Sequence, residues 1–242
     1  MKGLGTIVNV AAVVLAGLLG ILLKGGIKQK YQDTLMHVLG ISTIFIGVSG
    51  TLQEMFVIEN NKISVQGTML LVISLVLGAF CGEFLAIEDK LEKLGVWLKD
   101  KVRAKNDTRF VDGFVNATLV ICVGAMAIVG SLKDGLTGDH MTLFVKSALD
   151  FVIVMIFASA MGVGALFSAL PLGIYQGGIT VFAKFISPYL SDAMISDLNL
   201  VGSAMIFGIG VNLAFGKKFK VGNFLPGLLV PVIYELILSF IH

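Results

Sequence analysis

The sequence predicts an all-α, polytopic transmembrane helical bundle of about eight spans in a single domain covering residues 1–242, and three observations support this. Hydrophobic residues make up 56% of the chain and charged residues 14%, and the mean hydropathy is +0.93. A soluble domain has roughly 45–50% apolar and about 25% charged residues. Apolar runs near the ~20 residues needed to cross a bilayer recur along the chain. Lysine and arginine gather in alternate connections between these runs.

Eight apolar stretches are predicted to cross the membrane. The first is followed by Lys24-Gly25-Gly26 and not by a small-residue cleavage site, so we expect a retained helix and not a signal peptide. The fifth and sixth are expected to meet at a tight turn at Met161–Gly164. Seven spans plus a re-entrant or broken helix is the alternative. The predicted spans are Gly5–Leu23, Leu35–Leu52, Met69–Ile87, Val111–Leu132, Met141–Met161, Ala165–Ile186, Met194–Phe215 and Phe224–Phe240.

The distribution of positive charge predicts the orientation of these spans. Lysine and arginine in short loops collect on the cytoplasmic side of a membrane. With eight spans, the three basic connections fall on one face and both termini are expected outside, although a re-entrant segment around Pro171 would give the same result. The basic residues are Lys24, Lys28 and Lys30, then Lys90, Lys93, Lys99, Lys101, Arg103, Lys105 and Arg109, and finally Lys217, Lys218 and Lys220.

The long basic connection between the third and fourth spans has a helical pattern of its own, at about residues 88–105. Apolar residues recur at helical spacing, and Lys, Glu and Asp fill the remaining positions. This pattern favours an amphipathic helix on the inner membrane surface, with its lysines toward anionic headgroups. The alternative is a solvated extension of the third span. The apolar residues are Ile87, Leu91, Leu94, Leu98 and Val102, with Trp97 beside them.

Lys146 and Asp150 lie within the otherwise apolar run Phe144–Phe157, and their spacing of four places them on one face of a helix. A lone charge at the centre of an inserted helix costs about 2.5–3.5 kcal/mol on insertion scales. Both side chains are therefore expected to face protein or a water-filled cavity. In the functional interpretation Asp150 binds a proton or a cation and Lys146 tunes its charge. In the structural interpretation the two form a salt bridge that joins two helices.

Other polar residues lie within the predicted spans and are further candidates for a substrate or ion site. Glu83 lies little more than one turn from the inner boundary, close enough to extend its carboxylate to that surface. Isolated amides in spans often form hydrogen bonds between helices, worth roughly 0.6–2 kcal/mol. The amides are Asn9 in the first span, Asn116 in the fourth, Gln176 in the sixth and Asn212 at the end of the seventh, and Tyr175 lies next to Gln176.

The sixth span combines Ser168, Pro171 and Gly177 and is predicted to be broken or kinked. Proline removes one backbone donor, and the backbone groups released by a break need partners away from lipid. Secondary transporters use such breaks to present helix ends and carbonyls to a solute, whereas a simple proline kink has no such role. The eighth span has a weaker form of the same pattern at Pro226 and Pro231.

Two pairs of residues are expected to have structural roles. Gly78 and Gly82 form a small-xxx-small pair that allows close helix packing. Asp134 and Asp139 follow the fourth span on the outer side and are expected to be turn and capping residues, with a cation at the entrance as the alternative.

The second span resembles the seventh, which suggests an inverted repeat. Gly40, Ile44 and Phe45 align with Gly202, Ile206 and Phe207, listed in the same order. If the first three spans matched the last three, the chain would have an architecture common among secondary transporters.

Composition and motifs exclude several function classes. A net charge of +2 gives no nucleic-acid signature. Cys81 and Cys122 lie in apolar runs with no metal-ligand spacing, and the three histidines are scattered. Because hydrolase, zinc-protease and nucleotide-binding motifs are absent from the sequence, we expect neither an enzyme nor a cofactor or metal site. The expected partners are the lipid bilayer and a small solute or ion, and small residues in the spans also allow a homo-oligomer.

Several segments resemble a family of bacterial integral membrane proteins called YqgA-like or YdfK-like, for which no activity is established. They are GTIVNVAAVVLAGLLG, SLVLGAFCGEFLAIEDKLEKLG, GFVNATLVICVGAMAIVGSLKDGLTGDH, KSALDFV, GVGALFSALPLGIYQGGIT, DAMI and VGNFLPGLLVP. The resemblance implies a location in the bacterial cytoplasmic (inner) membrane. Asn116 departs from the family pattern, in which serine is common. The resemblance places the following polar residues in family-like motifs and so makes them candidates: Asn9, Glu83, Asp134, Asp139, Lys146, Ser147, Asp150, Ser168, Gln176, Asn212 and Asn223.

The sequence therefore favours a permease for a small polar or ionic solute that works by alternating access. Asp150 is expected to be the central carboxylate, with Gln176, Tyr175 and Ser168 completing the site and Glu83 at the inner exit. A passive channel with the same lining is one alternative. A non-transporting membrane protein that recruits a cytosolic partner through Leu91–Arg109 is the other.

Overall fold

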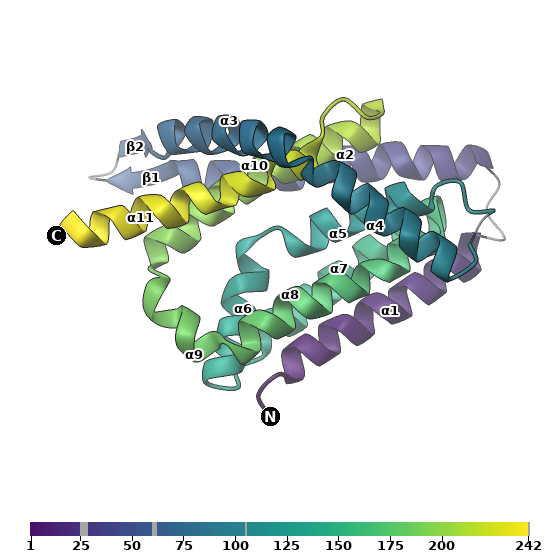
Figure 1. Ribbon diagram of the computed structural model, residues 1–242, viewed down its shortest axis with the longest axis horizontal. Helices are drawn as coiled ribbons and strands as arrows, with labels where there is room; N and C mark the ends of the chain where they lie inside the picture. Colours follow the sequence, from purple (N-terminus) through teal and green to yellow (C-terminus); the bar gives the residue numbers. More distant parts are fainter. Residues whose placement is uncertain (25–28, 60–61, 105, 242) are drawn as a thin grey trace. The chain divides into compact units, whose positions relative to one another are not determined.

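Helices form nearly all of the computed structural model, which describes residues 1–24, 29–59, 62–104 and 106–241 (Figure 1). The α-helices are α1 (Leu4–Lys24), α2 (Gln29–Met55), α3 (Thr68–Leu85), α4 (Ile87–Lys101), α5 (Phe110–Cys122), α6 (Ala125–Leu136), α7 (Met141–Met161), α8 (Ala169–Val181), α9 (Ala183–Ile186), α10 (Asp192–Phe215) and α11 (Leu229–Ile241). The 3₁₀ helices are η1 (Val163–Ser168), η2 (Ser187–Tyr189) and η3 (Val221–Leu228).

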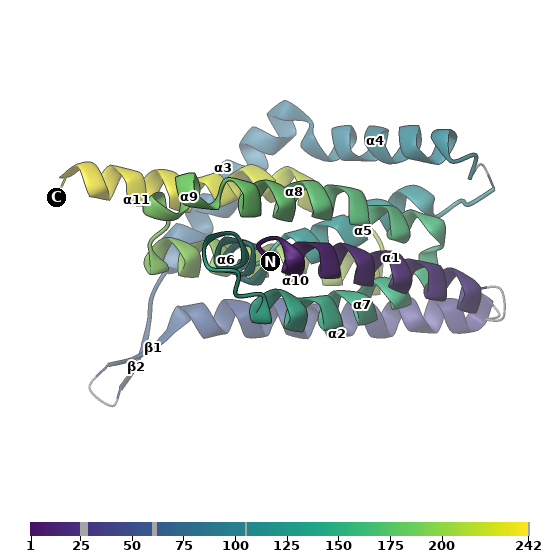
Figure 2. The ribbon, with the colours of Figure 1, turned by 90° about the horizontal axis from the view of Figure 1, so that it is seen from below.

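One element is not helical. Strands β1 (Phe56–Glu59) and β2 (Lys62–Val65) pair in antiparallel register, with Phe56 opposite Val65, and extend α2 as a hairpin (Figure 2). No strand was predicted here, although apolar and polar residues alternate in β2, as is typical of a strand; β1 instead begins with three apolar residues.

Five helices in the described part of the chain are long and apolar enough to cross a membrane. They agree with the predicted first, second, third, fifth and seventh spans and confirm an all-α polytopic bundle. The predicted fourth span is divided into α5 and α6 by a bend of 61°, and it makes a sixth crossing if the bent pair is counted as one. The five are Leu4–Leu23, Asp33–Met55, Thr68–Leu85, Met141–Met161 and Asp192–Phe215.

The predicted sixth and eighth spans each begin as a 3₁₀ helix and continue as a shorter α-helix. Pro171 is the third residue of α8, and Pro231 is the third residue of α11. A first-turn proline lacks only an N–H that would have no intrahelical partner, so both prolines are tolerated where they lie. The departure from α-helix therefore precedes Pro171 instead of occurring at it. The expected turn after α7 is present, at Gly162 with φ of 93°.

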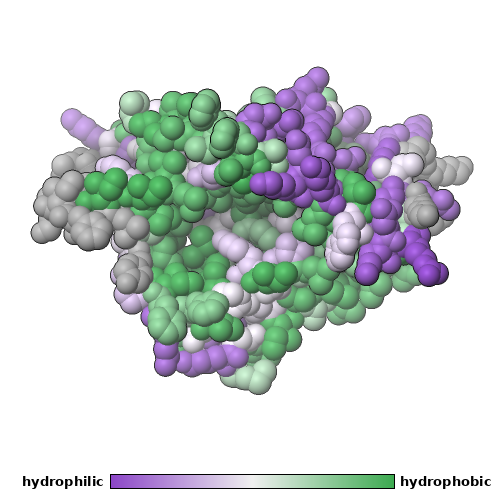
Figure 3. Space-filling model, in the orientation of Figure 1, coloured by the Kyte–Doolittle hydropathy of each residue, from purple (hydrophilic) through white to green (hydrophobic). Residues whose placement is uncertain are grey.

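Large apolar side chains are exposed on the helices that could cross the membrane. Phe80 and Phe84 of α3 are 76% and 85% exposed, and Phe45 of α2 is 69% exposed. Figure 3 shows hydrophobic residues over much of the visible face. A soluble monomer rarely exposes apolar patches of this extent, whereas a bilayer is a suitable solvent for them.

The chain divides into two compact units, and α2 and α4 pass from one to the other. The first unit comprises Met1–Leu39, Lys90–Cys122 and Met126–Pro188. In it α1 and α7 run parallel, because Gly5 lies against Leu143 and Gly20 against Ala158. The core of this unit is built from α1, α5, α7 and α8 and includes Val13, Ala16, Ile121, Val154, Ala169 and Leu172.

The second unit comprises Gly40–Asp89, Val123–Ala125 and Tyr189–His242. Its helices α2 and α10 are antiparallel, because Gly40 meets Ala214 and Gly47 meets Phe207. The two segments with similar sequences are thus packing partners within one unit. Each unit also contains a long helix followed by a 3₁₀ helix and a proline-bearing helix, namely α7–η1–α8 in the first and α10–η3–α11 in the second.

Candidate functional site

The first unit holds a buried polar network at the junction of three helices. Asn9 comes from α1, Lys146 and Asp150 from α7, and Gln176 from α8. Asn9 and Gln176 are 0% exposed, and Asp150 is 4% exposed. The expected i, i+4 geometry of Lys146 and Asp150 is present, with their ion pair inside the protein and not toward lipid.

Asn9 connects the other members of this network. Its Nδ2 donates to Asp150 Oδ2 at 2.9 Å and to Gln176 Oε1 at 3.2 Å. Lys146 Nζ donates to the same carboxylate oxygen of Asp150. One oxygen therefore accepts from an ammonium and an amide, and both bonds favour the ionised carboxylate.

Two buried polar atoms of the network have no hydrogen-bond partner among the described residues. They are the acceptor Oδ1 of Asn9 and the donor Nε2 of Gln176. A buried polar group without a partner costs about 1–3 kcal/mol. One amide acceptor and one amide donor thus remain able to bind water or a polar ligand.

The bend between α5 and α6 supplies a further contact. Lys146 Nζ donates to the carbonyl oxygen of Ile121 at 2.8 Å, and α5 ends one residue later. The last four carbonyls of a helix have no intrahelical partner and carry the negative end of its dipole. The interrupted helix thus directs a free carbonyl at the buried ammonium.

The remaining first-unit candidates do not hydrogen-bond to this network. Ser168 is buried, but its Oγ donates to Ala165 O at 2.7 Å within its own 3₁₀ turn. Tyr175 is 36% exposed on α8, and Asn116 is half-buried on α5.

Glu83 and Asn212 belong to the second unit. The Glu83 side chain is exposed and accepts from Asn223 Nδ2 at 2.5 Å and from Lys220 Nζ at 3.3 Å. Its hydrogen bond raises the pKa of Lys220, with Asp89 contributing in the same direction. Asn212 closes the turn after α10, where its Oδ1 accepts from Lys218 N at 2.8 Å and its Nδ2 donates to Phe219 O at 2.7 Å.

Asp134 joins the end of α6 to the start of α1. Its carboxylate accepts from the backbone N–H groups of Gly3 at 3.1 Å and Thr6 at 3.2 Å. His140 Nδ1 lies 3.4 Å from the same group. The fully buried Asp134 therefore caps the N-terminus of α1 from another helix, while Asp139 caps α7 through Met141 N at 3.1 Å.

Glu88 and Glu54 are two carboxylates of the second unit whose contacts were not predicted from the sequence. Glu88 is buried at the start of α4, where it accepts from Gly222 N at 2.8 Å and pairs with Lys217. Glu54 at the end of α2 accepts from Ser196 Oγ at 2.5 Å and Asn199 Nδ2 at 2.6 Å. Both lie beside expected boundaries, where a carboxylate is typically solvated, and therefore the sequence held no signal for these contacts.

The apolar exposed helices and the buried polar network define a polytopic α-helical membrane protein. The chain matches, over residues 4–236, the family model described as "Protein of unknown function (DUF554)", and it belongs to that family. It is 30% identical over 227 residues to the "Uncharacterized membrane protein YdfK" of Bacillus subtilis (strain 168), covering 94% of this chain and 93% of that protein.

A second relative is the "Uncharacterized protein YqgA" of Escherichia coli (strain K12), 27% identical over 231 residues, with 94% of each chain covered. The comparisons thus confirm the resemblance noted in the sequence. No solved structure matches.

Proposed function

We propose that the protein is a secondary transporter for a small polar or ionic solute in the bacterial cytoplasmic (inner) membrane, with both termini outside. It works by alternating access, and Asp150 binds the coupling proton or cation. The observation that carries the proposal is the position of Asn9, which links Asp150 to Gln176 while its own Oδ1 has no partner among the described residues.

Burial of the charge pair supports a functional role. Well-packed apolar residues in place of a buried ion pair are often as stable or more stable, so packing alone gives little reason for one. Ionisable residues within membrane spans commonly mark ion or substrate pathways. Here the charged pair lies beside an amide donor and an amide acceptor that remain unpaired.

The divided crossing α5–α6 also supports transport. Helix ends and free carbonyls within the membrane are tolerated where they face protein or a cavity, and transporters use them to hold ions. The carbonyl of Ile121 holds the Lys146 ammonium in this way. If Asp150 became protonated, Lys146 would lose its counter-charge but keep its hydrogen bond to this carbonyl. The same residues can therefore hold the Lys146 ammonium whether Asp150 is ionised or neutral.

Solute-driven proton movement in everted membrane vesicles tests the proposal. Vesicles are acidified by respiration and then receive, in turn, sodium chloride, potassium chloride, choline chloride, glycine, glutamate and lactate, while acridine orange reports the pH gradient. We expect at least one solute to dissipate the gradient in wild-type vesicles, and Asp150→Asn to abolish this response. Asp112→Asn is the matched control because Asp112 is exposed at the start of α5.

Three results would contradict this account. A full response by Asp150→Asn would remove the carboxylate from coupling. The absence of any solute response in wild-type vesicles would exclude proton-coupled transport of these solutes. Solute flux that is independent of proton and sodium gradients in proteoliposomes would identify a passive channel instead.

A further inference from the structure

The second unit contains a cavity of about 470 Å³ that is separate from the network of the first unit. It lies among the end of α2, the start of α3, the start of α10 and the first half of α11. Leu70, Leu200 and Val230 contribute apolar walls. Its size falls within the roughly 300–1,000 Å³ typical of small-molecule sites, which combine apolar walls with a few polar groups.

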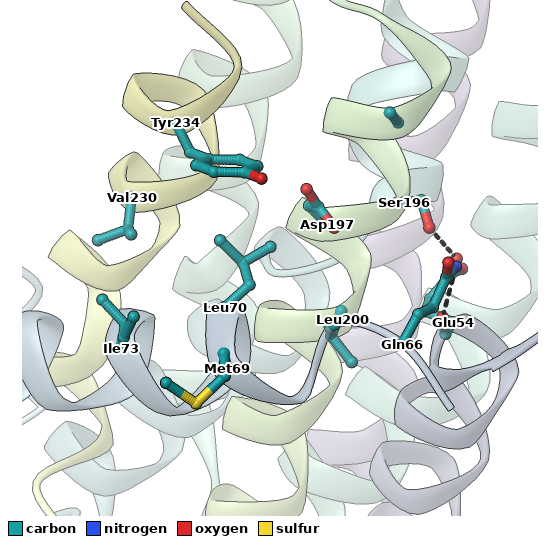
Figure 4. A pocket seen from close by; sticks show the side chains of 12 residues that line it. Glu54, Gln66, Met69, Leu70, Ile73, Ser196, Asp197, Leu200, Val230 and Tyr234 are labelled. Carbon is teal, nitrogen blue, oxygen red and sulfur yellow. Dashed lines mark hydrogen bonds between the residues drawn. The ribbon is translucent and has the colours of Figure 1, made fainter. Parts of the chain in front are cut away.

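The two carboxylates that line this cavity differ in the hydrogen bonds that they accept. Both carboxylate oxygens of Glu54 are occupied, one by Ser196 and the other by Asn199. The Asp197 carboxylate accepts no hydrogen bond from the described residues. Figure 4 shows Asp197 of α10 and Tyr234 of α11 directed toward one another across the cavity. Asp197 therefore offers a free carboxylate beside a phenol ring.

The charged side chains that line the cavity are acidic. Its lining includes the carboxylates of Glu54 and Asp197 and no lysine, arginine or histidine. The charged groups that act on Asp197 are Glu235 and Glu54, both acidic. Like charges at short range in a low-dielectric setting repel each other, and a bound cation relieves this repulsion.

The surroundings favour an organic cation over a metal ion. Among the described residues, no three His, Cys, Asp or Glu side chains are placed to hold a metal. Calcium and magnesium need several oxygen ligands, whereas Met69, Leu70 and Ile73 present apolar atoms to the cavity. An aromatic ring and a carboxylate are the groups that recognise alkylammonium ions.

We propose that this cavity binds a small organic cation, an ammonium group carrying an apolar substituent, with Asp197 as its counter-ion and Tyr234 beside it. The same chemistry occurs in free amines and in the ethanolamine or choline headgroup of a phospholipid. The proposal does not depend on transport, because neither residue contacts the network around Asp150.

Binding of benzyltrimethylammonium to the purified full-length protein in dodecylmaltoside tests the proposal. Isothermal titration calorimetry measures affinity, and phenylacetate serves as an anion of similar size. We expect saturable binding of the cation and none of the anion. Asp197→Asn should weaken binding by at least about tenfold, because it removes the charge of the counter-ion while preserving its shape.

Two further variants control for loss of the fold and for a change of charge elsewhere on α10. Asp197→Glu keeps the charge and should keep most of the affinity, and circular dichroism verifies that each variant is folded. Asp192→Asn makes the same chemical change on the first turn of α10, outside the cavity lining, and should bind as the wild type does. Absence of saturable binding, unchanged binding by Asp197→Asn, or equal losses in Asp197→Asn and Asp192→Asn would each overturn the proposal.

Nanodiscs separate the two sources of the cation. If phosphatidylethanolamine nanodiscs suppress benzyltrimethylammonium binding and phosphatidylglycerol nanodiscs do not, the occupant is a lipid headgroup. If neither suppresses it, the occupant is a free amine. Both results support the site and assign its ligand.

Discussion

Asn9 Nδ2 lies 2.9 Å from Asp150 Oδ2, although 141 residues separate the two in the sequence. This bond ties α1 to α7 at a fully buried point, and the second bond of the same amide, to Gln176, adds α8. The network can therefore hold three helices in one arrangement while Asp150 is ionised.

The ion pair gives a stability prediction that separates a structural role from a functional one. Lys146→Met leaves the buried Asp150 carboxylate without its counter-charge and is expected to destabilise the protein by about 3–5 kcal/mol. Lys146→Met combined with Asp150→Leu removes both charges and should recover most of that loss. The measurement is the free energy of unfolding in bicelles by titration with dodecyl sulfate.

Lys133→Met is the control for this series, because Lys133 is an exposed lysine of the same unit. Its effect should stay within about 0.5 kcal/mol. A double variant as unstable as Lys146→Met alone would show that the loss does not come from an uncompensated charge.

Glycine contacts between α3 and η3 give a packing prediction. A Cβ on Gly82 would overlap the backbone carbonyl of Asn223, and one on Gly78 would lie 2.6 Å from Gly227 N. We expect Gly82→Ala to cost about 1–3 kcal/mol or more, as in other overpacked contacts. Thermal unfolding monitored by circular dichroism measures the loss.

Gly177→Ala is the matched control, because a Cβ there meets no atom within 4 Å. Within helix α8 this change should stabilise the protein by up to about 1 kcal/mol. The packing account fails if the two alanine variants unfold at the same temperature.

Lys220 gives a prediction about pH. Its pKa is raised above the ordinary 10.5 by the Glu83 hydrogen bond and the neighbouring Asp89. Because the folded-state pKa is the higher one, the stabilising contribution is complete below about pH 10.5 and is lost as the pH rises through the raised value.

Glu83→Gln should lower the pKa of Lys220 and thereby increase the fraction of free amine at pH 9. Competitive labelling with trace acetic anhydride, read by mass spectrometry, should then show faster acetylation of Lys220 relative to Lys218. An unchanged ratio would mean that the contact does not persist in solution.

Trp97 reports the environment of α4. It is the single tryptophan of the chain and is 56% exposed, and Leu94 and Val96 are also exposed. If this helix lies on the membrane surface, Trp97 fluorescence in nanodiscs should shift to the blue and be quenched by lipids brominated near the headgroup. Efficient quenching by aqueous iodide instead would place the ring in solvent and favour a docking role for α4.

The parts of the candidate site that depend on local spacing were predictable from the sequence. Lys146 and Asp150 share a face because they are four residues apart, and their burial follows from the cost of exposing charge to lipid. The role of Asn9 was not predictable, since it depends on which helices pack against α1 and in what register. The bend after Cys122 also lacked a clear signal, because the fourth span contains no proline.

The helix irregularities show the same limit. Pro171 and Pro231 correctly marked two spans that are not continuous α-helices, although both prolines lie just after the 3₁₀ segments. Close approach explains the nearby glycines, since Gly164 lies against the carbonyl of Phe110 and Gly227 against that of Ser74. Which backbone approaches a glycine is tertiary information that a single sequence does not contain.

Access of water to the buried network is the most direct test of the central claim that this site lies on a solute pathway. Gln176→Cys is introduced into a background in which Cys81 and Cys122 are alanine, and it is exposed in nanodiscs to a trimethylammonium methanethiosulfonate reagent. Leu172→Cys, one turn earlier and equally buried in the apolar core, is the control. The account predicts measurable labelling at position 176 and none at position 172, whereas equal inertness of both would show a sealed structural network and contradict it.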